Sequence, residues 1–173
     1  MNLRFVPPEL GALDTENAEV LVASVFSDVR PAKGVAGLCD WRLGGRLSRL
    51  MREGFITGSV GEVVMVPGRP ATSFEKVLIF GAGERNSLNR VRLVGLVEHI
   101  ASSLAGLRAR AAVVEIPGRA DGLIGPVEGA AIAIERIEGL GAFDEWTLIE
   151  DAAGRAAIER HVAEQRRRQQ RLA

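Results

Sequence analysis

Val20-Leu21-Val22-Ala23 is an uninterrupted apolar run, and it decides the fold class of this chain. A strand covered by helices on both faces carries such a run, whereas a strand with one solvated face alternates apolar and polar residues. On either side of this run, short aliphatic stretches alternate with longer segments of helical period, which is the pattern of an α/β domain. The predicted strands are 3–6, 20–26, 62–66, 76–80, 112–116 and 146–149. We therefore expect a sheet with helices on both sides.

Four segments carry apolar residues at spacings of three and four, which predicts amphipathic helices. The first spans 37–52. Its Gly44-Gly45 pair costs up to about 1 kcal/mol per glycine, so we expect close packing against a neighbour there. The second spans 89–107. The third begins at Pro126, a residue suited to the first helical position, and the last follows Asp151, a predicted N-cap.

The composition is that of one globular domain. The chain has 173 residues, of which 47% are apolar, and this content excludes a disordered chain. The 22 Lys and Arg residues balance 22 Asp and Glu residues, so the net charge is zero. Nucleic acids and anionic membranes both select for a basic surface, so the charge weighs against either as a partner.

Cysteine content and the N-terminal sequence bear on the compartment. Cys39 is the single cysteine, so nothing in the sequence implies an oxidising environment. The N-terminal residues lack the apolar core of a secretion signal, and no stretch reaches the ~18 apolar residues of a membrane span. We expect a cytoplasmic, soluble protein.

The C-terminal segment 163–173 is basic and polar, in contrast to the 162 residues before it. One interpretation is a solvated helix end whose arginines complement the helix dipole, and this is the favoured one. The other is a basic patch for nucleic acid or an acidic partner, although the segment has no aromatic residue on which a base could stack. The sequence therefore predicts a domain at 1–162 followed by a basic helix end or tail at 163–173.

Several segments, read in order, resemble one family. They are Leu13-Asp14-Thr15, Gly34-Val35-Ala36-Gly37-Leu38-Cys39-Asp40, Gly44-Gly45-Arg46-Leu47-Ser48-Arg49-Leu50, Gly58-Ser59-Val60-Gly61-Glu62-Val63-Val64-Met65-Val66-Pro67 and Lys76-Val77-Leu78-Ile79-Phe80-Gly81-Ala82-Gly83. Together they resemble the N-terminal domain of the leucyl aminopeptidases, which has a macro-domain-like fold. Residues 116–126 resemble the second phosphate loop of macro domains. The resemblance implies a single macro-like domain, a three-layer α/β/α fold with a mixed, mostly parallel sheet.

The resemblance carries no catalytic residue to this chain. In the aminopeptidases, the metal ligands, the catalytic lysine and the bicarbonate-binding arginine lie in a separate C-terminal domain, whose Asn-Thr-Asp-Ala-Glu-Gly-Arg signature has no counterpart here. The residues of the chain also give no sign of a catalytic site. His99 and His161 are not in a metal-ligand spacing, and no Gly-x-Ser-x-Gly motif occurs. Cys39 is predicted to be a small core residue rather than a nucleophile. We therefore expect no enzyme activity, no metal and no cofactor.

Two glycine-rich loops precede predicted helices, so their backbone N–H groups are candidates to face an anion. In macro domains, loops that resemble these hold the diphosphate of ADP-ribose, and an aspartate placed like Asp14 binds the adenine amino group. By that resemblance the candidate ligand-binding residues are Asp14, Gly34, Val35, Gly37, Gly122, Leu123, Ile124 and Gly125. The alternative is structural, because Asp14 can cap a turn with Thr15 and the glycines suit tight turns without any ligand.

Two functions follow from these observations. The favoured one is a non-catalytic domain that acts in self-association or in binding a protein partner. Trp41 and Trp146 are candidate anchors if they are exposed, and the alternative for both is ordinary core or edge packing. The alternative is an ADP-ribose or nucleotide-binding macro domain. An ADP-ribose hydrolase is not expected, because hydrolysing macro domains carry an Asn-Ala-Ala-Asn run where this chain has Val22-Ala23-Ser24-Val25.

Overall fold

One six-stranded sheet forms the centre of the computed structural model, which describes residues 2–138 and 144–172. The strands are β1 (Asn2–Val6), β2 (Val20–Val25), β3 (Val63–Pro67), β4 (Lys76–Gly81), β5 (Ala111–Val114) and β6 (Glu145–Ile149), in the order β1-β6-β5-β2-β4-β3. Every neighbouring pair is parallel except β3 and β4. The predicted mixed, mostly parallel sheet is confirmed.

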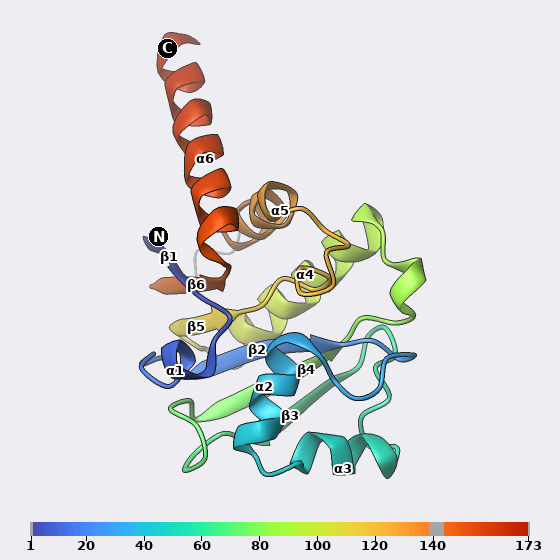
Figure 1. The fold of residues 1–173 in the computed structure, drawn as a ribbon. Helices are drawn as coiled ribbons and strands as arrows, with labels where there is room; N and C mark the ends of the chain where they lie inside the picture. Colours follow the sequence, from blue (N-terminus) through green and yellow to red (C-terminus); the bar gives the residue numbers. More distant parts are fainter. Residues whose placement is uncertain (1, 139–143, 173) are drawn as a thin grey trace.

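Helices cover both faces of this sheet (Figure 1). The layer on one face holds α1 (Leu10–Leu13), α2 (Gly34–Arg42) and α3 (Arg46–Arg52), and the layer on the other holds α4 (Arg90–Gly106), α5 (Pro126–Glu138) and α6 (Ala152–Leu172). A short 3-10 helix, Arg85–Ser87, precedes α4. Alternate residues of β2 serve the two layers: Val20 and Val22 pack with the α4–α6 layer, and Leu21 and Ala23 with the α1–α3 layer. The apolar run is therefore buried on both sides, as predicted.

The helix predicted over 37–52 is two helices, and this prediction was wrong. The break falls at Gly44-Gly45, whose φ angles of +62° and +79° lie in the left-handed region and cannot continue a right-handed helix. A Cβ at either position would meet nothing within 4 Å, so close packing is not what these glycines provide. The Asp40 carboxylate accepts hydrogen bonds from the Leu47 and Ser48 amides and ties the second helix to the first.

The other helix starts agree with the sequence. The Asn89 side chain accepts a hydrogen bond from the Arg92 amide, and α4 follows it. Pro126 is the first residue of α5. Asp151 accepts from the Gly154 amide at 2.7 Å and caps α6. These caps satisfy amides that a helix N-terminus leaves without intrahelical partners.

The last helix, α6, has 21 residues and continues past the sheet toward the C-terminus (Figure 1). The predicted boundary between 162 and 163 falls inside this continuous helix. The predicted domain limits also include residues 1, 139–143 and 173, which lie outside the described ranges. None of the helices in the described part of the chain is long and apolar enough to cross a membrane.

Candidate functional site

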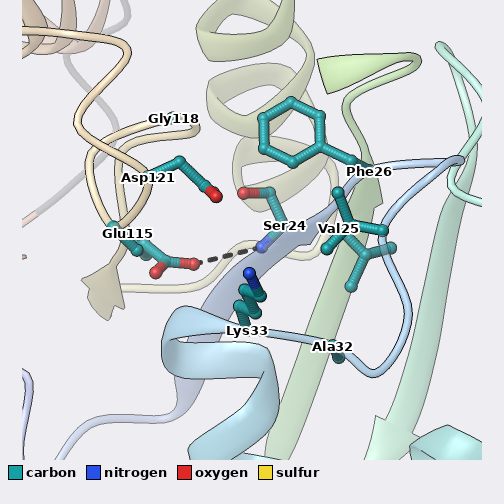
Figure 2. Close-up of a pocket in the computed structure, with 10 residues that line it drawn as sticks. Ser24, Val25, Phe26, Ala32, Lys33, Glu115, Gly118 and Asp121 are labelled. Carbon is teal, nitrogen blue, oxygen red and sulfur yellow. Dashed lines mark hydrogen bonds between the residues drawn. The ribbon is translucent and has the colours of Figure 1, made fainter. Parts of the chain in front are cut away.

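A narrow pocket lies where β2 and β5 end, at the carboxyl edge of the sheet. Parallel sheets place ligand sites at this edge, because the loops after the strands converge there. The pocket is lined by Ser24, Val25, Phe26, Val29, Ala32, Lys33, Glu115, Gly118, Ala120 and Asp121, most of which Figure 2 labels. Its free volume is about 20 Å³, enough for a single water molecule, whereas small-molecule sites are typically about 300–1,000 Å³.

Glu115 places its carboxyl group at the N-terminus of α2. The residue follows β5 directly, and its amide donates to the Val22 carbonyl, so side-chain alternation turns it toward the α1–α3 layer. Its Oε1 accepts from the Val35 amide at 3.0 Å. Its Oε2 accepts from the Ser24 amide at 3.4 Å, the hydrogen bond that Figure 2 shows. The Val35 amide, one of the loop donors that the sequence assigned to an external anion, therefore already binds a carboxyl group of the chain itself.

Gly34 makes this arrangement possible. Its φ is +59°, and a Cβ built on it would lie 2.5 Å from Oε1 of Glu115 and 2.8 Å from the Ala120 Cβ. Glycine is therefore required at this position both by the left-handed backbone and by the close approach of the carboxyl group.

Burial controls the protonation of Glu115. The side chain is buried, and this burial raises the pKa of Glu115 from 4.5 to about 7. Hydrogen bonds from Val35 and Ser24 act in the opposite direction, because they stabilise the carboxylate, and the nearby charge of Asp121 adds to the rise in the pKa. Glu115 is therefore an acid that titrates close to neutral pH at a helix N-terminus.

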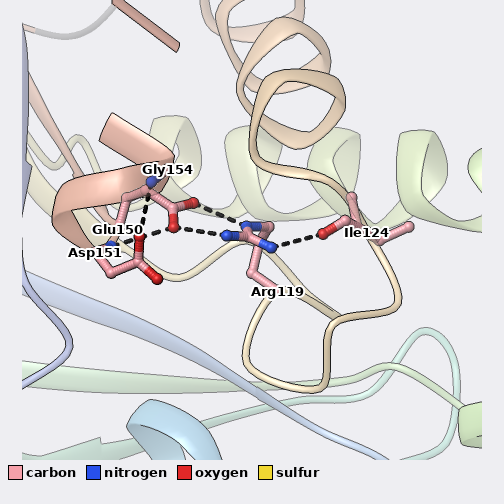
Figure 3. Close-up of polar contacts among 5 residues, drawn as sticks. All are labelled: Arg119, Ile124, Glu150, Asp151 and Gly154. Atoms are coloured by element: carbon pink, nitrogen blue, oxygen red, sulfur yellow. Dashed lines mark hydrogen bonds and ion pairs between the residues drawn. The ribbon is translucent and has the colours of Figure 1, made fainter. Parts of the chain in front are cut away.

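The second glycine-rich loop is held by a separate ion pair (Figure 3). Arg119 donates from Nε and Nη2 to the two carboxylate oxygens of Glu150, at 2.8 and 2.6 Å, and from Nη1 to the Ile124 carbonyl at 2.7 Å. Both side chains are largely buried, with 16% and 7% of their surface exposed. Glu150 also raises the pKa of Arg119, which keeps the guanidinium charged. A bidentate pair of this kind ties residues 118–125 to the end of β6.

The structure brings only part of the predicted site to the pocket. Gly34 and Val35 lie at its edge through their contacts with Glu115. Gly37 lies on the first turn of α2, where a Cβ would be 2.7 Å from the Ala32 carbonyl. It therefore serves the packing of that turn against the preceding loop.

The predicted residues of the second loop lie beside the pocket rather than in its lining. Ile124 is buried in the core of the α4–α6 layer, and Leu123 is 36% exposed. Gly122 has a φ of +68°, which the turn requires. Gly125 precedes α5 and has open space where a Cβ would be. Gly118 and Asp121 of the same loop do line the pocket.

Asp14 lies at the other edge of the sheet. It follows α1, and the carbonyl of its neighbour Leu13 accepts a hydrogen bond from Ser73, just before β4 begins. Its carboxylate pairs with Arg42, the last residue of α2, with Nε and Oδ1 3.2 Å apart. The pocket is at the opposite end of α2, so the structure does not bring Asp14 together with the two loops.

Sequence reasoning missed the charged residues of the pocket, which are Lys33, Glu115 and Asp121, and the Arg119–Glu150 pair that holds the loop beside it. One signal was present. Glu115 is an acid at the end of the apolar run Ala111-Ala112-Val113-Val114, a position where a charged residue must find a buried partner. The other residues act through contacts between distant segments, which a single sequence does not reveal.

The remaining candidate residues have structural surroundings. Cys39 is buried in the α1–α3 layer, and burial raises the pKa of its thiol to about 12, as suits a core residue rather than a nucleophile. His99 packs edge-on against Phe80, with ring centroids 5.2 Å apart. Within residues 2–138 and 144–172, no group of three or more His, Cys, Asp or Glu side chains is placed to hold a metal ion.

Comparison with known proteins identifies the family. A family model described as cytosol aminopeptidase family, N-terminal domain, matches residues 22–138. The chain belongs to this family. A probable cytosol aminopeptidase of Pseudomonas aeruginosa is 27% identical over 160 residues, which cover 84% of this chain and 32% of the relative. The chain thus spans about a third of the length of the curated relatives it matches.

Solved structures confirm the fold of this cytosol aminopeptidase N-terminal domain. A mutant of tomato leucine aminopeptidase superposes with a TM-score of 0.64 at 15% identity, covering 92% of this chain and 35% of that one. The Trypanosoma brucei macrodomain in complex with ADP-ribose superposes with a TM-score of 0.69 at 19% identity, covering 92% and 68%. At these identities the likeness establishes a macro-like, three-layer α/β/α fold.

Proposed function

We propose that this domain is a non-catalytic interaction module that acts in self-association or in binding a protein partner. The observation that carries the proposal is the position of Glu115. Its carboxyl group accepts a hydrogen bond from the Val35 amide, one of the donors that this helix N-terminus would offer a bound diphosphate. A ligand phosphate there would meet a buried acid instead of free donors.

Two further features support the same conclusion. The pocket has room for a single water molecule, so a dinucleotide-sized ligand would have to displace side chains that are already hydrogen-bonded. The loop at 118–125 is fixed by the Arg119–Glu150 ion pair and does not depend on a ligand for its order. The family model that matches the chain also describes an N-terminal domain.

The surface offers an anchor for a partner. Trp41 is 76% exposed on α2, where a large aromatic side chain in water is the type of residue that dominates interface energetics. Trp146, the other candidate anchor, is fully buried in the α4–α6 layer, so it takes the core packing that was the alternative for both tryptophans and is no surface anchor. Trp146 is buried because it lies on β6, next to the buried Thr147 and Leu148, and its side chain is part of the core.

The experiment is a calorimetric titration of ADP-ribose into the purified chain, with ADP and AMP alongside and light scattering on the same sample. We expect no saturable heat at millimolar ligand and a mass above one chain. Saturable micromolar binding that is lost in Gly125→Glu would overturn the proposal and establish the nucleotide-binding alternative. Turnover of a leucine amide by this chain with Mn²⁺ or Zn²⁺ would contradict the non-catalytic assignment.

A further inference from the structure

A large groove opens between β1, α5 and α6, far from the pocket at the end of β2. We call it the α5–α6 groove, and its volume is about 760 Å³. Its floor is apolar and consists of Leu3, Phe5, Val127, Ala130, Ala131, Ile134, Ile158 and Val162. Toward the C-terminal end of α6, the lining becomes polar, with Gln165, Arg166 and Gln169. The groove thus has an apolar floor and one polar, open end.

The charges at the groove are not balanced. The two acids in its lining have partners: Glu159 pairs with Arg155 at 2.8 Å, and Glu135 lies 3.8 Å from Arg136. The arginines of the projecting end of α6 differ. Among the described residues, none of Arg166, Arg167, Arg168 and Arg171 has an acidic side chain within ion-pair distance, and all four are exposed. Of these four, Arg166 lines the groove, so its polar end carries a positive charge that no acidic side chain of the described residues neutralises.

We propose that the α5–α6 groove binds an amphipathic helix of a partner protein, with its apolar face on the groove floor and acidic side chains against the arginines of α6. The inference rests on the proposed function as an interaction module and names its surface and the chemistry of its partner. An amphipathic helix in a groove recognises the apolar floor through residues at spacings of three and four. The unpaired arginines favour acidic residues beside that face and attract the partner in solution.

Other occupants fit less well. A second copy of the chain would bring an equally basic α6, and like charges repel. Nucleic acid would suit the arginines, but the floor of the groove is aliphatic apart from Phe5, and the projecting end of α6 has no aromatic residue for stacking. An acidic, amphipathic helix would pack its apolar face on the groove floor and pair its acidic side chains with the arginines of α6.

The probe is a synthetic peptide of about four helical turns, with leucines along one face and glutamates beside them. Its binding to the full chain is measured by fluorescence anisotropy, and a peptide of the same composition in scrambled order is the control. We expect saturable binding of the amphipathic peptide that weakens with salt, and about tenfold weaker binding of the scrambled peptide.

Two variants locate the binding site. Ala131→Trp fills the groove from an exposed position of α5, and Arg166→Glu reverses a rim charge, so each should weaken binding by about tenfold or more. The matched controls are Ala156→Trp, on an exposed position of α6 outside the groove lining, and Arg52→Glu at the end of α3. Both controls should bind as the wild type does.

The outcomes separate this inference from the proposed function. If the amphipathic peptide fails to bind, or if Ala131→Trp leaves its affinity unchanged, the groove assignment is wrong. The interaction function is tested separately, by the ADP-ribose titration and the particle mass. Tighter binding of a single-stranded RNA of matched length than of the peptide would also overturn the groove assignment. Micromolar ADP-ribose binding would instead contradict the proposed function, whatever the peptide does.

Discussion

Glu115 is the residue on which the account of the pocket depends. Macro-like folds present a helix N-terminus at the carboxyl edge of the sheet, and in this chain a buried carboxyl group occupies it. The turns of this region were predictable from the sequence because turns are rich in glycine. The group that occupies the helix N-terminus was not predictable, because the hydrogen bond between Glu115 and Val35 joins residues that lie 80 positions apart in the chain.

The raised pKa of Glu115 predicts how stability depends on pH. Because its pKa is about 7 in the folded chain and near 4.5 when unfolded, the folded state binds more protons between these values. Its contribution to stability is thus fully present below about pH 4.5 and is lost as the pH rises through about 7, by at most about 1.4 kcal/mol per pH unit.

Glu115→Gln removes this dependence, since the amide oxygen can still accept from the Val35 amide and carries no charge. The measurement is the free energy of unfolding of both proteins, by chemical denaturation at pH 5, 6, 7 and 8. The two values should be similar at pH 5, and at pH 8 the variant should be more stable than the wild type by up to about 3 kcal/mol. A constant difference across this range would mean that Glu115 does not titrate there.

Gly34 gives a second prediction at the residue scale. Gly34→Ala places a Cβ against the Glu115 carboxyl group, whereas Gly44→Ala has the same left-handed backbone, with φ of +62° against +59°, and open space around its Cβ. We expect the second variant to lose about 1 kcal/mol from backbone strain and the first to lose clearly more. Equal losses in thermal or urea denaturation would mean that the close approach to Glu115 does not matter.

At the scale of elements, the strands were predictable to within two residues, but the short helix α1 was not predicted and the helix predicted over 37–52 is two helices. A continuous amphipathic pattern over 37–52 indicated a single helix because Leu47 and Met51 do face the core. The spacing of apolar residues carries no sign of a left-handed backbone pair such as Gly44-Gly45. This pair turns the chain, and α3 starts in a new direction after it. Burial thus fixed which residues face the sheet, and the local backbone fixed where the helix ends.

The ion pair that holds the loop 118–125 is the second testable feature at this scale. Arg119→Met leaves the largely buried Glu150 without its bidentate partner, so it should lower the free energy of unfolding by about 3 kcal/mol. Arg110→Met removes an exposed pair with Asp144 and should cost less than about 1 kcal/mol. Urea denaturation measures the free energy of unfolding of both variants. If Arg119→Met loses no more stability than Arg110→Met, the Arg119–Glu150 pair does not hold the loop.

For the whole molecule, the order of apolar runs and helical segments was enough to predict a sheet covered by helices on both faces, because that arrangement depends on burial patterns that the sequence carries. The family and the macro-like fold came from the resemblance of particular segments to the leucyl aminopeptidases. The arrangement of Asp14 and the two loops was not predictable in the same way. Asp14 lies at the amino edge of the sheet beside Arg42, and the linear order of residues does not say at which edge a connecting segment ends.

Trp41 gives a prediction for assembly. Because its indole is 76% exposed, Trp41→Ala removes little folded-state packing, and thermal stability should change by less than about 1 kcal/mol. If Trp41 anchors the association of copies, the mass measured by light scattering should fall to that of one chain. A mass above one chain that is the same in the wild type and the variant would show that the anchor lies elsewhere.

The most direct test of the central claim follows the Val35 amide by NMR during a pH titration and then during addition of ADP-ribose. The account predicts that the Val35 signal titrates near pH 7, because its hydrogen-bond acceptor is Glu115, and that millimolar ADP-ribose leaves it unmoved. A Val35 signal that does not titrate, and that shifts saturably with ADP-ribose, would show that the helix N-terminus serves a ligand and not the chain's own carboxyl group.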